Sequence, residues 1–212
     1  MDTADKVAPF SVTSLDDLAE IYHAPLATAV TKETDHVTEP GRAFIAASPF
    51  LMLATAGRAG VDCSPKGDVP GFVQLLDDRT IAIPDRPGNN RIDGLKNIID
   101  NPRVGIIFMV PGSNSTYRVN GTARISTDPG LLGRFEVRGK LPRTVIVVAV
   151  EVAFSHCPKA FVRAKLWDSG REIPPGHVPT HGDFAAYRDG GDKAYAEKYD
   201  VEYAERMKSR LY

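Results

Sequence analysis

The sequence has few cysteines and no long apolar run, and each shortage excludes a class of protein. The two cysteines, Cys63 and Cys157, are too few for a disulfide framework or a clustered thiolate metal site. The longest apolar run, Val145–Val150, is far shorter than the about 20 residues that cross a bilayer. Residues Met1–Phe10 lack the apolar core of a secretory signal. We therefore expect a cytoplasmic protein with reduced thiols.

The chain also lacks an excess of either charge and the glycine-rich loops of nucleotide-binding folds. It has 26 basic and 27 acidic residues, with no basic block and no alternation of basic and aromatic residues, so no nucleic-acid surface is expected. No G-x-G-x-x-G or G-x-x-x-x-G-K motif is present, which disfavours Rossmann and P-loop folds. The 212 residues suit one domain, with a core at about 44–167 and extensions at 1–43 and 168–212.

Short apolar or alternating runs fill the middle of the chain and predict strands. Phe50–Ala56 and Val61–Lys66, separated by a turn with a glycine at each end, predict a hairpin. Because these strands adjoin one another with one helix among them, we expect a mainly β (α+β) fold, an antiparallel barrel of six to seven strands flanked by N- and C-terminal helices. The further predicted strands are Phe72–Leu76, Arg79–Ile83, Val104–Val110, Thr116–Ile125 and Arg143–Phe154.

Helical periodicity and capping residues predict the helices. Within the barrel, Asn90–Asp100 carries a single apolar stripe, and Pro102 ends it. Near the C-terminus, tyrosines at steps of four predict a packing face against the barrel or a second subunit. The other expectations are a helix starting at a capping box of Ser14 with Asp17, a helix at Glu39–Ala47, a short helix from Asp128-Pro129 to Phe135, an extended loop at Asp168–Gly182, and the C-terminal stripe Tyr195, Tyr199, Tyr203, Met207 and Leu211.

The segment Ile81–Arg91 leads from a strand into this central helix and has the features of a phosphate-binding turn. Asn89 and Asn90 are good N-cap residues, and Arg91 would lie in the first helical turn. Unpaired amides, the positive end of the helix dipole and a guanidinium would then converge on a bound dianion. An ordinary strand-to-helix turn with a solvated arginine explains the same spacing equally well.

Two later strands indicate a covered outer surface. Thr116–Ile125 alternates strictly between apolar and polar residues, which predicts one core face and one polar face. Arg143–Phe154 is apolar on both faces apart from Glu151, so something must cover its outer face. A dimer interface would supply that cover. Thr116 and Arg118 could then hydrogen-bond a planar polar ligand held between subunits.

Several short segments, each weak alone, occur together in a specific order. They are Ala46–Phe50, Ser64–Asp68, Pro84–Arg91, Asn101–Gly105, Arg118–Gly121 and His156–Ala160, continuing through Arg163 to Leu166-Trp167. From about Phe44 to Trp167 this series resembles the pyridoxamine 5′-phosphate oxidase-like flavoproteins, the FMN-binding split β-barrels. It is most similar to the branch of probable FMN-dependent enzymes.

The resemblance implies a homodimer with two FMN molecules at the subunit interface. Ser64–Lys66 would lie along the ribityl chain and the edge of the isoalloxazine ring, and Thr116 would contact the ring. Lys66, Arg118 and Arg163 are candidates for stabilising the anionic reduced flavin. The residues implied for the phosphate are Asn89, Asn90 and Arg91, those for backbone contacts are Ile83, Pro84 and Asp85, and those approaching from the C-terminal side, from either subunit, are Arg163, Lys165 and Trp167.

The function that the resemblance implies is an FMN-dependent oxidoreductase, in which the flavin carries the chemistry and no side chain is required as an acid or base. Hydride would come from NAD(P)H or a small organic donor, and oxygen, free flavin or another acceptor would take the electrons. The alternative is a non-catalytic protein that stores or senses flavin or haem. Vitamin B6 oxidation is disfavoured, because Asp168–Tyr212 lacks the arginine and histidine motifs that hold its substrate, and only Ser209–Tyr212 resembles them.

Other candidate chemistries have simpler explanations. His177 and His181 have the spacing of a helical metal pair, but the prolines and glycines around them oppose a helix, so no metal site is expected. His156 and Cys157 are adjacent in a predicted strand and would point to opposite faces, which opposes a catalytic dyad. Trp167 could fill a core or stack on a flavin, and the sequence does not separate the two.

Overall fold

The computed structural model describes residues 10–170, 173–174, 176–209 and 211. The chain divides into two compact units, residues 1–33 and 34–212, and each is described by itself. In the described part of the first unit, α2 (Leu15–Ile21) and α3 (Ala27–Val30) bury no residue. Ser14 Oγ accepts a hydrogen bond from the Asp17 amide at 3.0 Å, which confirms the predicted start of α2.

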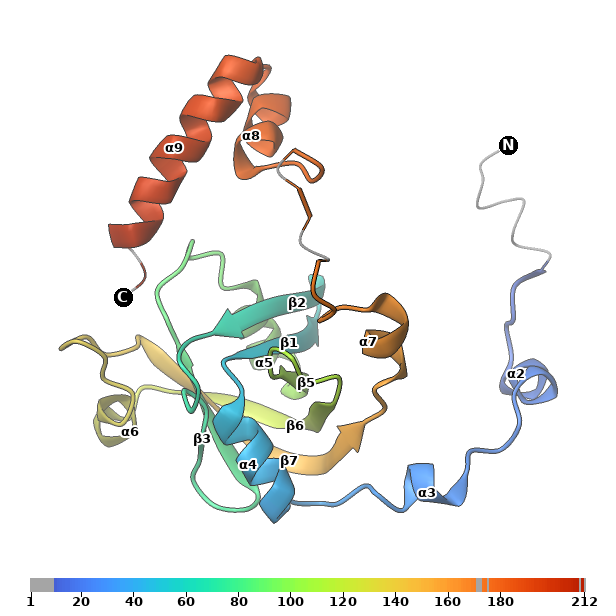
Figure 1. The fold of residues 1–212 in the computed structure, drawn as a ribbon. Helices are drawn as coiled ribbons and strands as arrows, with labels where there is room; N and C mark the ends of the chain where they lie inside the picture. The colour runs from blue at the N-terminus through green and yellow to red at the C-terminus, as the bar shows by residue number, and fades with distance from the viewer. Residues whose placement is uncertain (1–9, 171–172, 175, 210, 212) are drawn as a thin grey trace. The chain divides into compact units, whose positions relative to one another are not determined.

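The second unit is built on one antiparallel sheet (Figure 1). The sheet has seven strands in the order β2-β1-β5-β6-β7-β4-β3, so β2 and β3 are its two edges and the barrel is open between them. This confirms the predicted antiparallel fold and hairpin. The strands are β1 (Phe50–Gly57), β2 (Gly60–Gly67), β3 (Gln74–Leu75), β4 (Thr80–Asp85), β5 (Arg103–Met109), β6 (Thr116–Ser126) and β7 (Thr144–His156).

Each strand differs from its predicted bounds by at most two residues at either end, and β3 and β4 show the physical reasons. β3 has only two residues, because Phe72 and Val73 are buried in the core without joining the ladder. β4 continues through Pro84 to Asp85, past the predicted end at Ile83. Proline is tolerated there because β3 pairs with β4 only at Leu75 and Gln74, so β4 has no partner on that side at Pro84.

The curled sheet encloses one main hydrophobic core, to which most strands and two helices contribute. The helices are α4 (Glu39–Ala47), whose bounds match the prediction, and α5 (Asp93–Asp100), which packs on β1, β2 and β6. The predicted core face of β6 is confirmed by buried Tyr117, Val119 and Ala123. The side chains with almost no exposure are Ile45, Leu51, Leu53, Ile81, Ile83, Ile106, Phe108, Val119, Ile146 and Val148.

A β-bulge explains why β7 is apolar on both faces. The pairing of β6 with β7 shifts between Asn120 and Gly121, which makes Glu151 an extra residue on β7. Core-facing residues of β7 therefore have even numbers up to Val150 and an odd number at Ala153. After the bulge, the residues of β7 that face the core are the odd-numbered ones. Without the extra residue, Ala153 would face outward.

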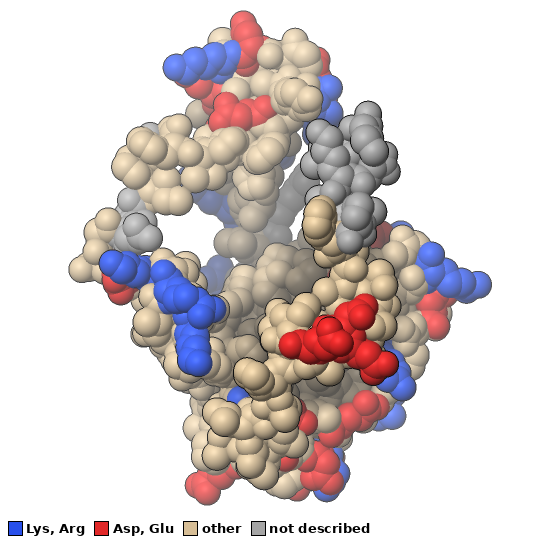
Figure 2. All heavy atoms as spheres, turned by 90° about the vertical axis from the view of Figure 1, so that its right-hand side faces the viewer, with Lys and Arg blue, Asp and Glu red and all other residues tan. Residues whose placement is uncertain are grey.

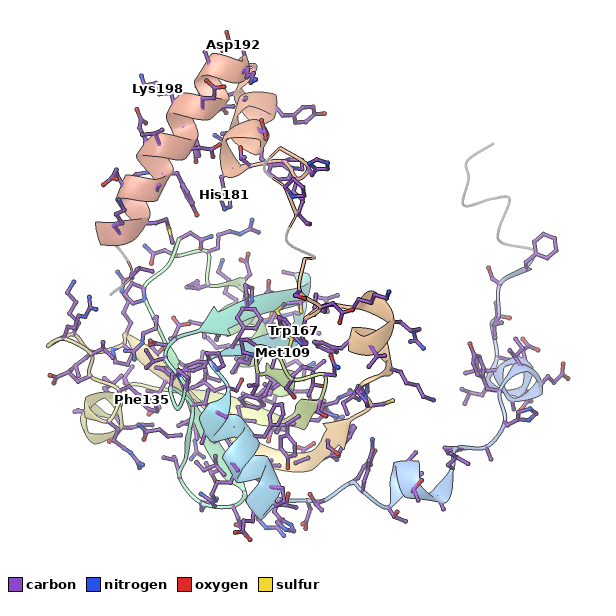
Figure 3. All side chains as sticks on the ribbon, viewed as in Figure 1. Met109, Phe135, Trp167, His181, Asp192 and Lys198 are labelled. Carbon is purple, nitrogen blue, oxygen red and sulfur yellow. The ribbon has the colours of Figure 1, made fainter. Side chains whose placement is uncertain are left out.

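The chain itself covers part of the outer face of β7. Val145 and Val147 form a second, smaller cluster with Ala82 and Phe135, against which α6 (Pro129–Gly133) packs (Figure 3). Over this part of the strand the chain itself supplies the cover, so cover by a second subunit stays a prediction only for the remainder. The reason is the short helix, whose cap at Asp128 was predicted and whose leucines cover the outer face.

The start of α5 was predicted wrongly. The helix begins at Asp93, because Asn90 and Ile92 have left-handed φ angles of 61° and 51°, which no helical turn accommodates. Neither Asn89 nor Asn90 caps the helix, and Arg91 precedes it instead of lying in its first turn. The left-handed conformation is costly for a β-branched residue such as Ile92, so residue propensities did not predict it here.

The C-terminal segment forms α7 (Lys159–Ala164), α8 (His181–Asp189) and α9 (Lys193–Ser209). The predicted loop ends two residues early, because Thr180 and Asp183 make a capping box that starts α8 at His181. Along α9, Tyr195, Tyr199 and Tyr203 stack on one another, and Arg206 lies over the last two rings.

α8 and α9 pack together, so the stripe meets α8 at Tyr203, whereas the predicted partners were the barrel or a second subunit, and Tyr195 and Met207 stay exposed. Tyr203 contacts the His181 ring, and the Gly182 amide donates to Asp200 Oδ1 at 2.7 Å. Asp192 caps α9 by accepting from the Tyr195 amide (Figure 3). In the predicted terminal motif, Arg210 and Tyr212 lie outside the described residues. Among the described residues, no helix is long and apolar enough to cross a membrane.

The bulge region gives a direct test of the fold. A Cβ at Gly121 would collide with the Ala149 carbonyl oxygen and lie 3.3 Å from Val148 Cγ1. We expect Gly121→Ala to destabilise the protein by about 3 kcal/mol and to lower Tm by roughly 6–12 °C. Gly133→Ala is the matched control, because nothing lies within 4 Å of its added Cβ and Tm should not fall. Equal melting temperatures for the two variants would contradict this account of the bulge.

Candidate functional site

A cavity of about 840 Å³ lies where the barrel is open, between β2 and the loop that follows β4. We call it the β2–β4 cavity. Its size lies within the range of about 300–1,000 Å³ that is typical of small-molecule sites. Its walls come from three separate stretches of sequence. They are residues 62–67 on β2, residues 84–95 from the end of β4 into α5, and Arg143, directly before β7, with Thr144 and Ile146 on it; Leu53 and Phe72 complete the lining.

Seven of the thirteen predicted site residues line the β2–β4 cavity. Ile83 does not, because its side chain is fully buried in the core, although its backbone lies next to the lining. The other five lie outside the cavity of the single chain. The residues in the lining are Ser64, Lys66, Pro84, Asp85, Asn89, Asn90 and Arg91, and those outside it are Thr116, Arg118, Arg163, Lys165 and Trp167.

Two ion pairs cross the opening of the barrel. Lys66 Nζ on β2 lies 2.8 Å from Asp85 Oδ1 on β4, and both side chains are about four-fifths buried. Just beyond, Arg86 Nε lies 2.8 Å from Asp68 Oδ2, and Arg86 Nη1 donates to the Phe135 carbonyl at 2.7 Å. Because β2 and β4 share no backbone pairing, these side chains fix the width of the cavity.

The floor of the cavity is polar along β2. Asp62, Ser64 and Lys66 alternate with more exposed residues and therefore share its inner face. Ser64 Oγ donates to Asp62 Oδ2 at 2.6 Å. A Cβ at Gly94 would lie 3.0 Å from that carboxylate oxygen, so a side chain there would press on Asp62 where α5 approaches β2. This row of hydroxyl, carboxylate and ammonium groups suits a ligand that carries hydroxyls.

Arg91 is held in place by its neighbours in sequence. Its amide donates to Asn89 Oδ1 at 3.0 Å, and its Nε lies 2.8 Å from Asp93 Oδ2. Hydrogen bonds from Arg91 first and Lys96 second lower the pKa of the Asp93 carboxyl. The Arg91 side chain is nevertheless 78% exposed, so it can reach a ligand at the rim of the cavity.

Arg143 and Thr144 are site residues that the sequence did not indicate. Arg143 Nη1 donates to Asn90 Oδ1 at 3.0 Å, and this contact joins the start of β7 to the loop before α5. Thr144 Oγ1, at the wall of the cavity, is buried and has no hydrogen-bond partner among the residues that the structure describes. No motif indicated either residue. The only feature of the sequence that marks Arg143 is its position, after a proline and immediately before the apolar strand β7.

The predicted residues outside the cavity have contacts of their own. Thr116 is buried at the start of β6, and Arg118 Nε donates to Asn120 Oδ1 at 3.2 Å while its guanidinium lies over the Phe154 ring. Trp167 stacks on Phe161, and its Nε1 donates to the Ser113 carbonyl at 2.8 Å (Figure 3). That indole is therefore tied to the loop after β5, and its contact with a flavin stays a prediction.

The lining suits a ligand with one anionic end and one flat apolar part. Leu53, Phe72, Leu95 and Ile146 supply apolar surface, while Lys66, Arg86, Arg91 and Arg143 supply positive charge. The orphaned hydroxyl of Thr144 and the hydroxyl and carboxylate row of β2 can hydrogen-bond the part between. FMN has this succession of a ring system, a polyol chain and a terminal phosphate, so the residues present fit it.

A metal centre finds no support in the described part of the chain, where no three histidine, cysteine, aspartate or glutamate side chains are grouped. His181 begins α8 and packs on Tyr203, which accounts for it structurally. Both cysteines are free and exposed, and Cys63 borders the cavity from β2.

Comparisons with known proteins give one family. Residues 37–157 match the family model described as pyridoxamine 5′-phosphate oxidase. Similar solved structures include HupZ of Group A Streptococcus, with 27% identity, coverage of 56% of this chain and 93% of that chain, and a TM-score of 0.46. A protein from Lactobacillus delbrueckii described as a putative pyridoxamine 5′-phosphate oxidase has 20% identity, coverage of 57% and 95%, and a TM-score of 0.46.

The FAD binding protein from Mycobacterium smegmatis has 15% identity, coverage of 58% of this chain and 97% of that chain, and a TM-score of 0.40. A comparison with curated proteins finds no match.

Proposed function

The chain belongs to the pyridoxamine 5′-phosphate oxidase family, and we propose that it binds FMN in the β2–β4 cavity and acts as an FMN-dependent oxidoreductase. The observation that carries the proposal is the lining itself, which joins a polar strand, an apolar wall and four cations around about 840 Å³. When bound, the flavin would supply the redox chemistry by accepting and passing on hydride or electrons.

The residues at the rim would hold the phosphate. They are the predicted Asn89, Asn90 and Arg91, of which Arg91 is exposed and donates its amide hydrogen to the side-chain oxygen of Asn89. Because Asp93 pairs with Arg91, a phosphate must share that guanidinium or displace the carboxylate. A dianion is a stronger partner for arginine than a single carboxylate, since it offers more charge and more acceptor oxygens.

The inner part of the cavity would hold the rest of the cofactor. Asp62 would accept hydrogen bonds from the ribityl hydroxyls, the Ser64 hydroxyl would accept or donate, and the backbone of residues 83–85 would contact the ring edge. Lys66, which its ion pair with Asp85 holds at the wall, would be the cation placed to stabilise negative charge on the ring. No residue of the chain is required as a general acid or base.

A homodimer would complete the site. Thr116, Arg118, Arg163, Lys165 and Trp167 lie outside the cavity in the single chain, so they can reach the flavin only if a second subunit brings them there. Apolar side chains near these residues remain exposed, which supports an interface on this side of the barrel. They are Ile107, Val162, Leu166 and Trp167 itself.

Flavin is favoured over haem as the cofactor. Histidine, methionine, tyrosine and cysteine are the residues that ligate haem iron. Of these the lining holds only Cys63, which is exposed on the edge strand. Storage or sensing of flavin, without turnover, is the remaining alternative, and the electron donors tested below separate it from catalysis.

The cofactor and its phosphate contact can be tested together. We expect purified protein to release FMN, and not FAD or haem, in a mass spectrum. Arg91→Ala removes a charge-assisted contact, so the affinity for FMN should fall by about 10- to 150-fold in a fluorescence titration. Arg124→Ala, an exposed arginine on β6 outside the cavity, should bind FMN as the unchanged protein does. Full affinity in Arg91→Ala would show that the phosphate binds elsewhere.

Light scattering tests the proposed assembly. The protein with FMN should have twice the mass of one chain, because the ring contacts need a second subunit. Ile107→Lys places a charge on the exposed apolar surface of β5 and should shift the mass toward the monomer, with a weaker affinity for FMN. A monomeric protein that binds FMN at full affinity would contradict the shared site.

Electron transfer separates an enzyme from a binding protein. Anaerobic NADH or NADPH should bleach the bound flavin, and air should restore the colour through repeated cycles. Pyridoxamine 5′-phosphate should reduce it poorly, because the C-terminal phosphate motifs are missing from the sequence. If no donor reduces the bound flavin faster than free FMN under the same conditions, storage or sensing is the better account.

A further inference from the structure

Arg143 differs from the other cations that line the β2–β4 cavity. Lys66 pairs with Asp85, Arg86 with Asp68 and Arg91 with Asp93, each at 2.8 Å. Among the described residues, Arg143 has no ion pair, and its side-chain hydrogen bond goes to the neutral amide of Asn90 at 3.0 Å. Its charge is therefore the one in the lining that no carboxylate of the described chain offsets.

The contact with Asn90 fixes where that charge lies. Asn90 has a left-handed φ of 61°, a conformation that asparagine tolerates better than most residues. Its side-chain oxygen accepts from Arg143, while the side-chain oxygen of Asn89 accepts from the Arg91 amide. The two consecutive asparagines thus orient two arginines, one from the loop before α5 and one from the start of β7.

We infer that Arg143 binds the terminal phosphate of the flavin and makes the cavity select FMN over riboflavin, with Asn90 as its positioning residue. The inference rests on the proposed function and adds to it a residue that lies far in sequence from the strand-to-helix turn. A phosphate approaching Arg91 must compete with Asp93, whereas at Arg143 it competes only with a neutral amide. Arg143 therefore contributes a large share of the preference for a phosphorylated ligand.

The experiment compares two ligands that differ only in the phosphate. The flavin-free full-length protein is titrated with FMN and with riboflavin, and the ratio of the two affinities is the readout. Arg143→Gln should lower the affinity for FMN by about 10- to 150-fold, as expected for loss of a charged hydrogen bond, and leave that for riboflavin within about twofold. Arg143→Lys should restore part of the loss, because it keeps the charge but not the forked geometry. Arg124→Gln should change neither affinity.

Asn90→Gly tests the positioning role, since glycine keeps the left-handed backbone and removes the side chain. It should lower the affinity for FMN by less than Arg143→Gln does. In the double variant it should add little further loss, because it acts through Arg143.

Other outcomes would overturn the inference in distinguishable ways. Equal losses for FMN and riboflavin in Arg143→Gln would show a structural role for the arginine. A full FMN preference in Arg143→Gln, together with its loss in Arg91→Ala, would refute the inference and leave the proposed function intact. If the unchanged protein binds riboflavin as tightly as FMN, both the phosphate site and the inference fail.

Discussion

The opening of the barrel and the two ion pairs that cross it set the separation of β2 from β4, and with it the size and place of the candidate site. A sheet in the order β2-β1-β5-β6-β7-β4-β3 leaves β2 and β4 without shared backbone hydrogen bonds. Lys66 with Asp85 and Arg86 with Asp68 join the two sides instead. Such largely buried pairs cost desolvation and do little for net stability, but removing one partner is expensive, so they hold a defined separation. The β2–β4 cavity is the space that this separation leaves.

Most cations of the cavity are already paired with carboxylates of the same chain. The cavity could therefore bind an anion without first gathering several unpaired arginines. Each cation of the lining except Arg143 has a carboxylate partner within the described chain, so the free protein avoids strong repulsion among them. On the surface that Figure 2 shows, basic and acidic side chains likewise occur in small groups of either sign. A ligand phosphate would then be recognised by a local arrangement of donors and not by the net charge, which is only −1.

Much of the fold followed from periodicity and capping. The alternation of β6, the hairpin of β1 and β2, and the start of α6 at Asp128 depend on residues close in sequence, and they were predicted. The errors arose where distant residues decide the local conformation. β4 can continue through Pro84 because β3 does not pair with it there. Asn90 and Ile92 adopt left-handed angles in a loop that Arg143, directly before β7, contacts through Asn90.

The sequence by itself determined the antiparallel sheet, the place of the loop before α5 in the cavity lining, and seven of the side chains that line the cavity. These depend on side-chain period, turn chemistry and short motifs, which act over a few residues. Only the tertiary structure decided that β7 changes face at Glu151, that α6 covers its outer side, and that Arg143 joins Asn90. Those features come from strand register and from contacts across tens of residues, and no local pattern encodes the distance between two side chains that the curl of a sheet brings together.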